Sequence, residues 1–123
     1  MRQIRLTAGD STALATLNDT ATADAVWAAL PFTAGGNRWG AEIYFEIPVH
    51  VPQASDARDV LEAGDLGYWP VGHAFCIFWG PTPASRGAEI RAYSPVNVFG
   101  RLEGDPTAFD AVPSGADIQV DRA

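Results

Sequence analysis

The sequence contains no lysine, because all eight basic residues are arginines. This absence excludes a Schiff-base lysine and the lysine of a phosphate-binding P-loop. The chain has a formal net charge of −7 and no cluster of basic residues. We therefore expect no nucleic-acid partner and no attraction to an anionic membrane surface.

Cysteine is also scarce, since Cys76 is the only one. A single cysteine forms no internal disulfide and no cysteine-rich metal site. No apolar run reaches the length of about 18 residues that a transmembrane helix needs, and the N-terminal residues do not read as a signal peptide. The sequence predicts one cytoplasmic domain, residues 1–123, large enough to form its own hydrophobic core.

The most informative stretch runs from Gly64 to Pro83. Leu66 to Trp69 is typical of a strand, and after a short loop Ala74 to Trp79 is typical of a second one. The second strand is apolar on both faces, whereas a strand with one solvated face would alternate. We expect it at the centre of the fold, where burial of Phe75 or Phe78 contributes about 1.5–3 kcal/mol each.

One helix is expected at about residues 20–30, because Asn18, Asp19 and Thr20 offer N-caps and Pro31 stops the helical spacing. Short strands are expected elsewhere, at 1–8, 13–17, 39–47, 96–102 and around 118–120, with 89–94 extended and a turn at 35–37. Strand 39–47 places Ile43 and Phe45 on one face and Glu42, Tyr44 and Glu46 on the other. Residues 48–63 and 103–115 show no regular pattern, except that 57–61 fits either one helical turn or a short strand.

Many short strands and one early helix indicate a mainly β protein in which the sheet forms a closed or nearly closed β-barrel. Closure of the sheet explains how strand 74–79 is covered on both of its faces. One face fills the barrel, and the other lies under the helix or a loop.

Three runs in the sequence resemble a known family. They are Gly-Asp-Leu-Gly-Tyr-Trp-Pro (64–70), Phe-Cys-Ile-Phe-Trp-Gly-Pro-Thr-Pro (75–83) and Val-Asn-Val-Phe-Gly-Arg-Leu (96–102). Together they resemble the cyclophilin-like family of small prokaryotic proteins, over nearly the whole chain. The resemblance implies a trimmed cyclophilin-type closed β-barrel whose second helix, near 103–115, is shortened or absent. It implies no characterised function.

A more distant similarity to the cyclophilins themselves invites a test of the prolyl isomerase site. Matching the proline of their Arg-Ile-Ile-Pro run to Pro48 puts Phe45 in place of the catalytic arginine and Val96 in place of a site histidine. Gln53 keeps the spacing of a site glutamine, and His50 replaces a pocket phenylalanine. Twisting a prolyl amide requires a donor beside the proline nitrogen, which Phe45 does not supply.

The remaining chemistry-bearing residues favour structural roles. His50 and His73 are 23 residues apart without a ligand-spacing motif, so no metal site is expected. Glu42 and Glu46 lie about 13 Å apart along a strand at about 3.3 Å per residue, which suits solvated side chains better than a catalytic pair. Cys76 lies in an apolar strand and is expected to be an unreactive structural thiol.

We therefore expect a binding barrel that takes a small molecule or a peptide in the cleft equivalent to the cyclophilin proline pocket, with no cofactor. Its candidate ligand-binding residues are Tyr44, Phe45, His50, Gln53, Tyr68 and His73. Two alternatives stay open: a peptidyl-prolyl isomerase with a rebuilt site, by fold analogy, and a structural homodimer module.

Overall fold

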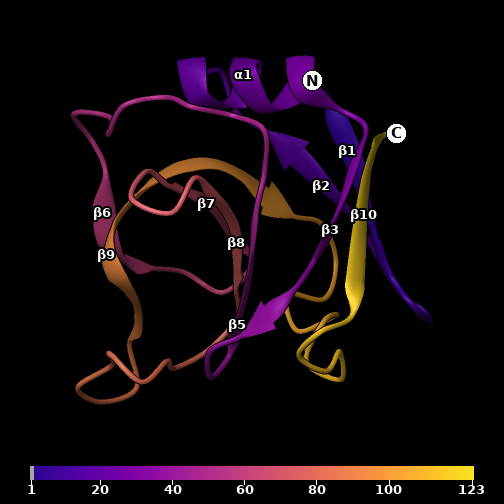
Figure 1. Cartoon of the computed structure of the whole chain (residues 1–123). Helices are drawn as coiled ribbons and strands as arrows, with labels where there is room; N and C mark the ends of the chain where they lie inside the picture. The colour runs from indigo at the N-terminus through magenta and orange to yellow at the C-terminus, as the bar shows by residue number, and fades with distance from the viewer. Residues whose placement is uncertain (1) are drawn as a thin grey trace.

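The computed structural model describes residues 2–123. The expected mainly β architecture with one short helix is confirmed (Figure 1). The elements in chain order are β1 (Gln3–Ala8), β2 (Ser11–Leu17), α1 (Ala21–Ala29), β3 (Phe32–Gly35), β4 (Asn37–Arg38), β5 (Glu42–Glu46), β6 (Arg58–Leu61), β7 (Asp65–Trp69), β8 (Ala74–Phe78), β9 (Ile90–Leu102) and β10 (Asp117–Arg122).

The strands form one antiparallel sheet whose neighbours follow the order β3-β10-β1-β2-β9-β7-β8-β5-β4, with β6 paired to β9 beside this path. The two ends of the path are strands that follow each other in the chain, because only Gly36 separates β3 from β4. The first and last strands of the chain, β1 and β10, pair with each other inside this order, and the Ala123 N–H donates to the Gln3 carbonyl at 3.0 Å.

Helix α1 lies across one end of the strands (Figure 1). Thr20, one of the three N-caps that the sequence offers, is the one used, and the Thr20 hydroxyl accepts a hydrogen bond from the Ala23 N–H at 3.1 Å. The helix packs Ala23 and Val26 into the core. Trp27 is half-buried against the core, and the guanidinium groups of Arg2 and Arg122 lie over its ring at 5.6 and 4.6 Å from the centroid.

The core has two parts, one on each face of strand β8. On the inner face Phe75 is fully buried, stacked on Phe45 at 4.9 Å and edge-on to Phe99 at 5.0 Å between ring centroids. On the other face Cys76 and Phe78 belong to a smaller cluster beneath β6 and β9. All five residues of β8 are buried, which confirms that this strand is covered on both sides.

Two local predictions in the first half of the chain are wrong. The segment 35–37 is not a turn, since β3 and β4 continue past Gly36, where an added Cβ would lie 3.1 Å from Ile43 and Ile118. Nor is 39–47 a single strand: the chain bends at Gly40, which has a positive φ of 65°, and β4 and β5 form a hairpin.

The segment from Pro48 to Ala57 crosses the molecule without regular structure and is fixed by the buried side chain of Asn97. The Asn97 amide donates to the Pro52 carbonyl at 3.0 Å and to the Thr22 hydroxyl at 3.1 Å, and its oxygen accepts from the Ala54 N–H at 2.7 Å. Residues 58–61 then form strand β6, which settles the choice left open by the sequence. Residues 103–115 consist of turns, as expected.

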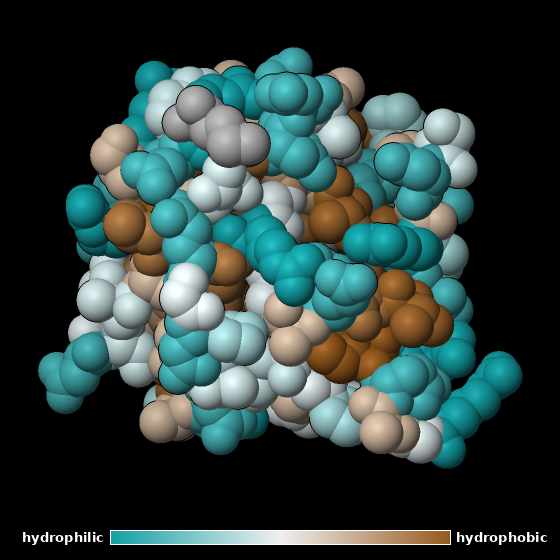
Figure 2. All heavy atoms as spheres, turned by 180° about the vertical axis from the view of Figure 1, so that it is seen from behind, coloured by the Kyte–Doolittle hydropathy of each residue, from teal (hydrophilic) through white to brown (hydrophobic). Residues whose placement is uncertain are grey.

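Seen from behind, hydrophobic residues reach the surface in separate patches among hydrophilic ones (Figure 2). Among residues 2–123, the large apolar side chains exposed on the surface are Val60, Val71 and Tyr93. Within residues 2–123, no helix is long and apolar enough to span a membrane.

Candidate functional site

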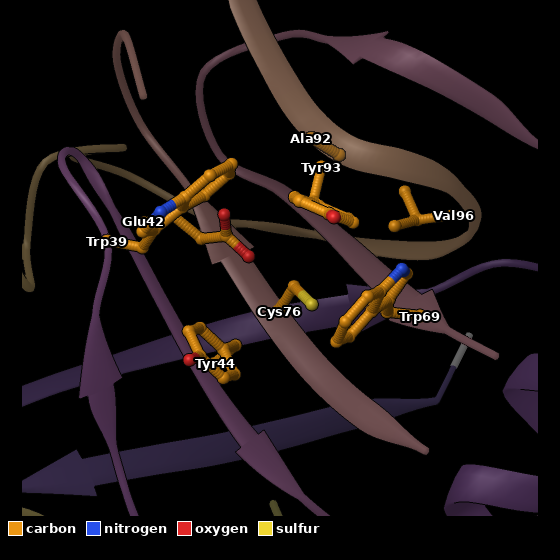
Figure 3. A pocket seen from close by; sticks show the side chains of 8 residues that line it. All are labelled: Trp39, Glu42, Tyr44, Trp69, Cys76, Ala92, Tyr93 and Val96. Atoms are coloured by element: carbon orange, nitrogen blue, oxygen red, sulfur yellow. The ribbon is translucent and has the colours of Figure 1, made fainter. Parts of the chain in front are cut away.

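A cavity of about 130 Å³ lies on the outer face of the strands β5, β7 and β8, where β9 covers them. Its walls come from the β4–β5 bend and from these four strands (Figure 3). The residues that line it are Trp39, Glu42, Tyr44, Trp69, Cys76, Ala92, Tyr93 and Val96. Six of the eight are aromatic, aliphatic or small, so the cavity is mainly apolar around a single carboxyl group.

The alternation of strand β5 explains which of its side chains reach the cavity. Ile43 and Phe45 point into the inner core, and Glu42 and Tyr44 therefore point to the other face. Tyr44 pairs directly with Cys76 of β8 across the sheet, which places both at the floor of the cavity. This face would be solvated if β9 did not run over it.

Three aromatic rings meet at steep angles along the cavity wall. Tyr93 contacts both Trp39 and Trp69 edge-to-face, with ring centroids 6.1 and 5.9 Å apart and interplanar angles of 62° and 74°. The indole N–H of Trp69 donates to the Ser94 hydroxyl at 2.6 Å, which fixes that ring. Tyr93 itself is 75% exposed and forms the outer rim.

Glu42 is the polar centre of the cavity, and its carboxyl group points into the space between the aromatic rings (Figure 3). The residue is only 4% exposed, and one carboxyl oxygen, Oε1, has no hydrogen-bond partner in the described residues. Burial raises the pKa of Glu42 from 4.5 to about 7, because it disfavours the charged form. The same burial, with the Glu42 charge beside it, raises the pKa of Cys76.

The prediction that Glu42 is a solvated side chain is therefore wrong. Glu46 follows Tyr44 on the same face of the strand, and it is exposed as expected. The difference arises because the first half of β9, with Ala92 and Tyr93, covers the Glu42 end of the strand. Cys76 is 2% exposed and is a buried thiol, as expected.

Among the six candidate binding residues, Tyr44 lines this cavity. Phe45 and Tyr68 have no exposed surface, because both side chains belong to the inner core. The Tyr68 hydroxyl donates to the Val49 carbonyl at 2.6 Å, which satisfies its polar atom there.

The other three candidates lie on the crossing segment and on the β7–β8 loop. The rings of His50 and His73 are brought together, with centroids 4.0 Å apart, and Gln53 is exposed. These residues are not part of the aromatic cavity. Within residues 2–123, no group of three histidine, cysteine, aspartate or glutamate side chains is placed to hold a metal ion.

The two positions matched to cyclophilin catalytic residues are apolar and buried. Phe45 is in the inner core, and Val96 is 1% exposed in the wall of the cavity. None of the residues that line the cavity is basic. The site therefore contains no arginine that could donate to a prolyl nitrogen.

Trp39, Glu42 and Tyr93 were not among the residues predicted to form a site, although all three line the cavity. The available signal was the spacing Trp39, Glu42 and Tyr44, which puts two aromatic rings and a carboxylate within six residues. It could not show that Tyr93, about 50 residues later, closes over them.

The whole chain can be compared with known proteins. A family described as cyclophilin-like matches residues 2–121. The solution structure of the hypothetical protein AF2241 from Archaeoglobus fulgidus superimposes with a TM-score of 0.85 and 36% sequence identity, covering 99% of this chain and 95% of that chain. No curated protein matches the sequence. The match in sequence and in structure shows that the chain belongs to the cyclophilin-like family.

Proposed function

We propose that this cyclophilin-like domain is a binding module that takes a small organic molecule, or a single side chain of a peptide, in the cavity around Glu42. The observation that carries the proposal is the buried carboxyl oxygen Oε1 without a hydrogen-bond partner, in a cavity walled by aromatic rings. A buried polar atom left unsatisfied costs about 1–3 kcal/mol, and a ligand that pairs with it recovers this energy. Apolar walls with one polar group are typical of small-molecule sites.

Most of the cavity wall is carried by strands of the sheet. We propose that the sheet is a closed barrel, supported by the return of the chain from β3 to β4 through Gly36 at the two ends of the strand order. A closed sheet has no free edge, and its strands hold each other in register. Glu42, Tyr44, Trp69 and Cys76 all lie on strands of this sheet, so their positions are fixed by its hydrogen bonds.

Binding fits the site better than prolyl isomerisation does. The isomerase reaction requires a preorganised donor at the prolyl nitrogen, and the cavity offers a carboxyl group and indole rings instead. The cavity also has room for only a small group. We therefore place the ligand at Tyr44 and Glu42, on the opposite face of β5 from Phe45.

Thermal unfolding in the presence of a panel of compounds tests this proposal. The panel contains cationic, neutral and anionic small molecules and short peptides. A ligand at about 100 times its Kd stabilises the folded state by about 2.7 kcal/mol, which raises Tm by several degrees. We expect at least one chemical class to raise the Tm of the natural chain.

Matched variants decide whether the stabilisation comes from this cavity. Tyr93→Ala removes part of the wall at little structural cost, because the side chain is 75% exposed, and it should abolish the shift. Val60→Ala changes an exposed apolar side chain outside the cavity and should keep it. The proposal fails if no class of compound stabilises the protein, or if Tyr93→Ala responds like the natural chain.

A further inference from the structure

We propose that the group bound in this cavity is an organic ammonium cation, held by the Glu42 carboxylate and by the faces of the surrounding aromatic rings. This inference rests on the proposed function and adds the charge and chemical class of the ligand.

The buried carboxylates of Glu42 and Asp65 differ in their counter-ions. The other buried carboxylate of the chain, Asp65, is paired with Arg58 at 3.5 Å and Arg101 at 3.7 Å and accepts a hydrogen bond from the Glu62 N–H at 2.8 Å. Glu42 is buried to the same degree, yet no basic residue lines its cavity. A buried carboxylate without a partner is costly, and a bound cation supplies the charge that Asp65 obtains from arginine.

The four tryptophans differ in whether a guanidinium group lies over the ring. Two of them already hold a cation: Trp27 lies under Arg2 and Arg122, and the Arg38 guanidinium lies 5.0 Å from the Trp79 ring centroid. The other two, Trp39 and Trp69, line the cavity, and within residues 2–123 no guanidinium lies over either ring. Aromatic faces attract cations, so these rings offer an unused site for one.

The arrangement of the rings suits a rounded cation. Trp39 and Trp69 stand steeply to Tyr93, on either side of it, and Tyr44 lies beside Glu42 (Figure 3). Aromatic walls on several sides are the arrangement by which proteins recognise alkylated ammonium groups. A cavity of about 130 Å³ accepts a trimethylammonium group and a short chain, but not a bulky ligand.

The charge state of Glu42 gives the inference a pH signature. Burial raises the pKa of Glu42 to about 7, so the carboxylate form rises from about one tenth at pH 6 to about nine tenths at pH 8. The titratable groups that face it are Tyr44 on its own strand, Cys76 from β8 and Tyr93 from β9. A cation binds the ionised form, so its affinity should rise about tenfold over this range, and binding near pH 7 should release protons.

Calorimetric titration with two probes of nearly equal shape tests the inference. Choline carries the trimethylammonium group, and its neutral isostere replaces the nitrogen with carbon. At pH 8 we expect choline to bind the natural chain at least about tenfold more tightly than the isostere, with weaker binding at pH 6. Glu42→Gln should lose most of the preference for choline and keep only the part that the aromatic rings supply, whereas Glu46→Gln, on the exposed part of the same strand face, should keep the full preference.

The possible failures are distinguishable. Equal affinity of the two probes for the natural chain at pH 8 overturns the cation assignment without using any variant. If choline does not bind but another class in the ligand panel does, the cation assignment is also wrong and the binding function stands. If nothing in the panel binds, both proposals fail.

Discussion

Replacing Glu42 by glutamine should change how the stability of this protein depends on pH. Burial raises the pKa of Glu42 from 4.5 to about 7, so between these values the folded protein holds a proton that the unfolded chain has released. Stability therefore falls as pH rises through this window, because the unfolded state binds fewer protons than the folded state. Well above pH 7 both states have released this proton, so the loss of stability no longer grows.

The size of the effect follows from the two pKa values. Integrated from pH 5 to pH 8, a shift from 4.5 to about 7 amounts to about 2–3 kcal/mol of lost stability. Glutamine has nearly the same shape and does not titrate. Relative to the natural chain, Glu42→Gln should therefore be about 2–3 kcal/mol more stable against unfolding at pH 8 than it is at pH 5.

Urea unfolding followed by far-UV circular dichroism at the two pH values measures this difference. Comparing the change between pH values cancels any constant cost of the glutamine amide and the contribution of other titrating groups, such as Glu89. Glu46→Gln, an exposed carboxyl on the same strand face, is the matched control and should show a change well under 1 kcal/mol. If Glu42→Gln and Glu46→Gln behave alike, Glu42 is not the desolvated acid described above.

Three further predictions concern the core, the thiol and catalysis. Phe75→Ala should lose about 3–5 kcal/mol in urea unfolding through transfer and cavity terms, whereas the exposed Val71→Ala should lose under about 0.5 kcal/mol; similar losses would contradict the assignment of the core. Cys76 is 2% exposed with a raised pKa, so it should react with a thiol reagent only after denaturation, and rapid labelling of the folded protein would place β8 at the surface. A coupled prolyl-peptide assay should show no turnover above background, and robust turnover that Gln53→Ala abolishes would refute this.

The parts of the fold that the sequence predicted are those with local signals. Six consecutive apolar residues in 74–79 have no solvated face, and this alone required cover on both sides. Thr20 and Pro31 delimit the helix by capping and by the missing N–H of proline. The bend at Gly40 was missed because the apolar alternation runs through it, and only the positive φ shows that the chain turns there.

The candidate site was harder to predict because its cover comes from a distant strand. Alternation placed Glu42 and Tyr44 on one face correctly, but a carboxylate on a strand face is ordinarily solvated. Ala92 and Tyr93 of β9 lie about 50 residues further along the chain and change that environment. Phe45 was expected at the site from its spacing to Pro48, although the same alternation places it in the inner core with Phe75.

The most direct test of ligand binding in this cavity uses the four tryptophans as reporters of position. Each indole N–H gives its own signal in an NMR spectrum of the ¹⁵N-labelled protein, assigned by single Trp→Phe variants. During titration with choline at pH 8 we expect the signals of Trp39 and Trp69, which line the cavity, to shift saturably and together. Trp27 and Trp79, which lie elsewhere against arginines, should not move. Shifts confined to Trp27 and Trp79, or equal shifts of all four signals, would contradict a ligand site around Glu42.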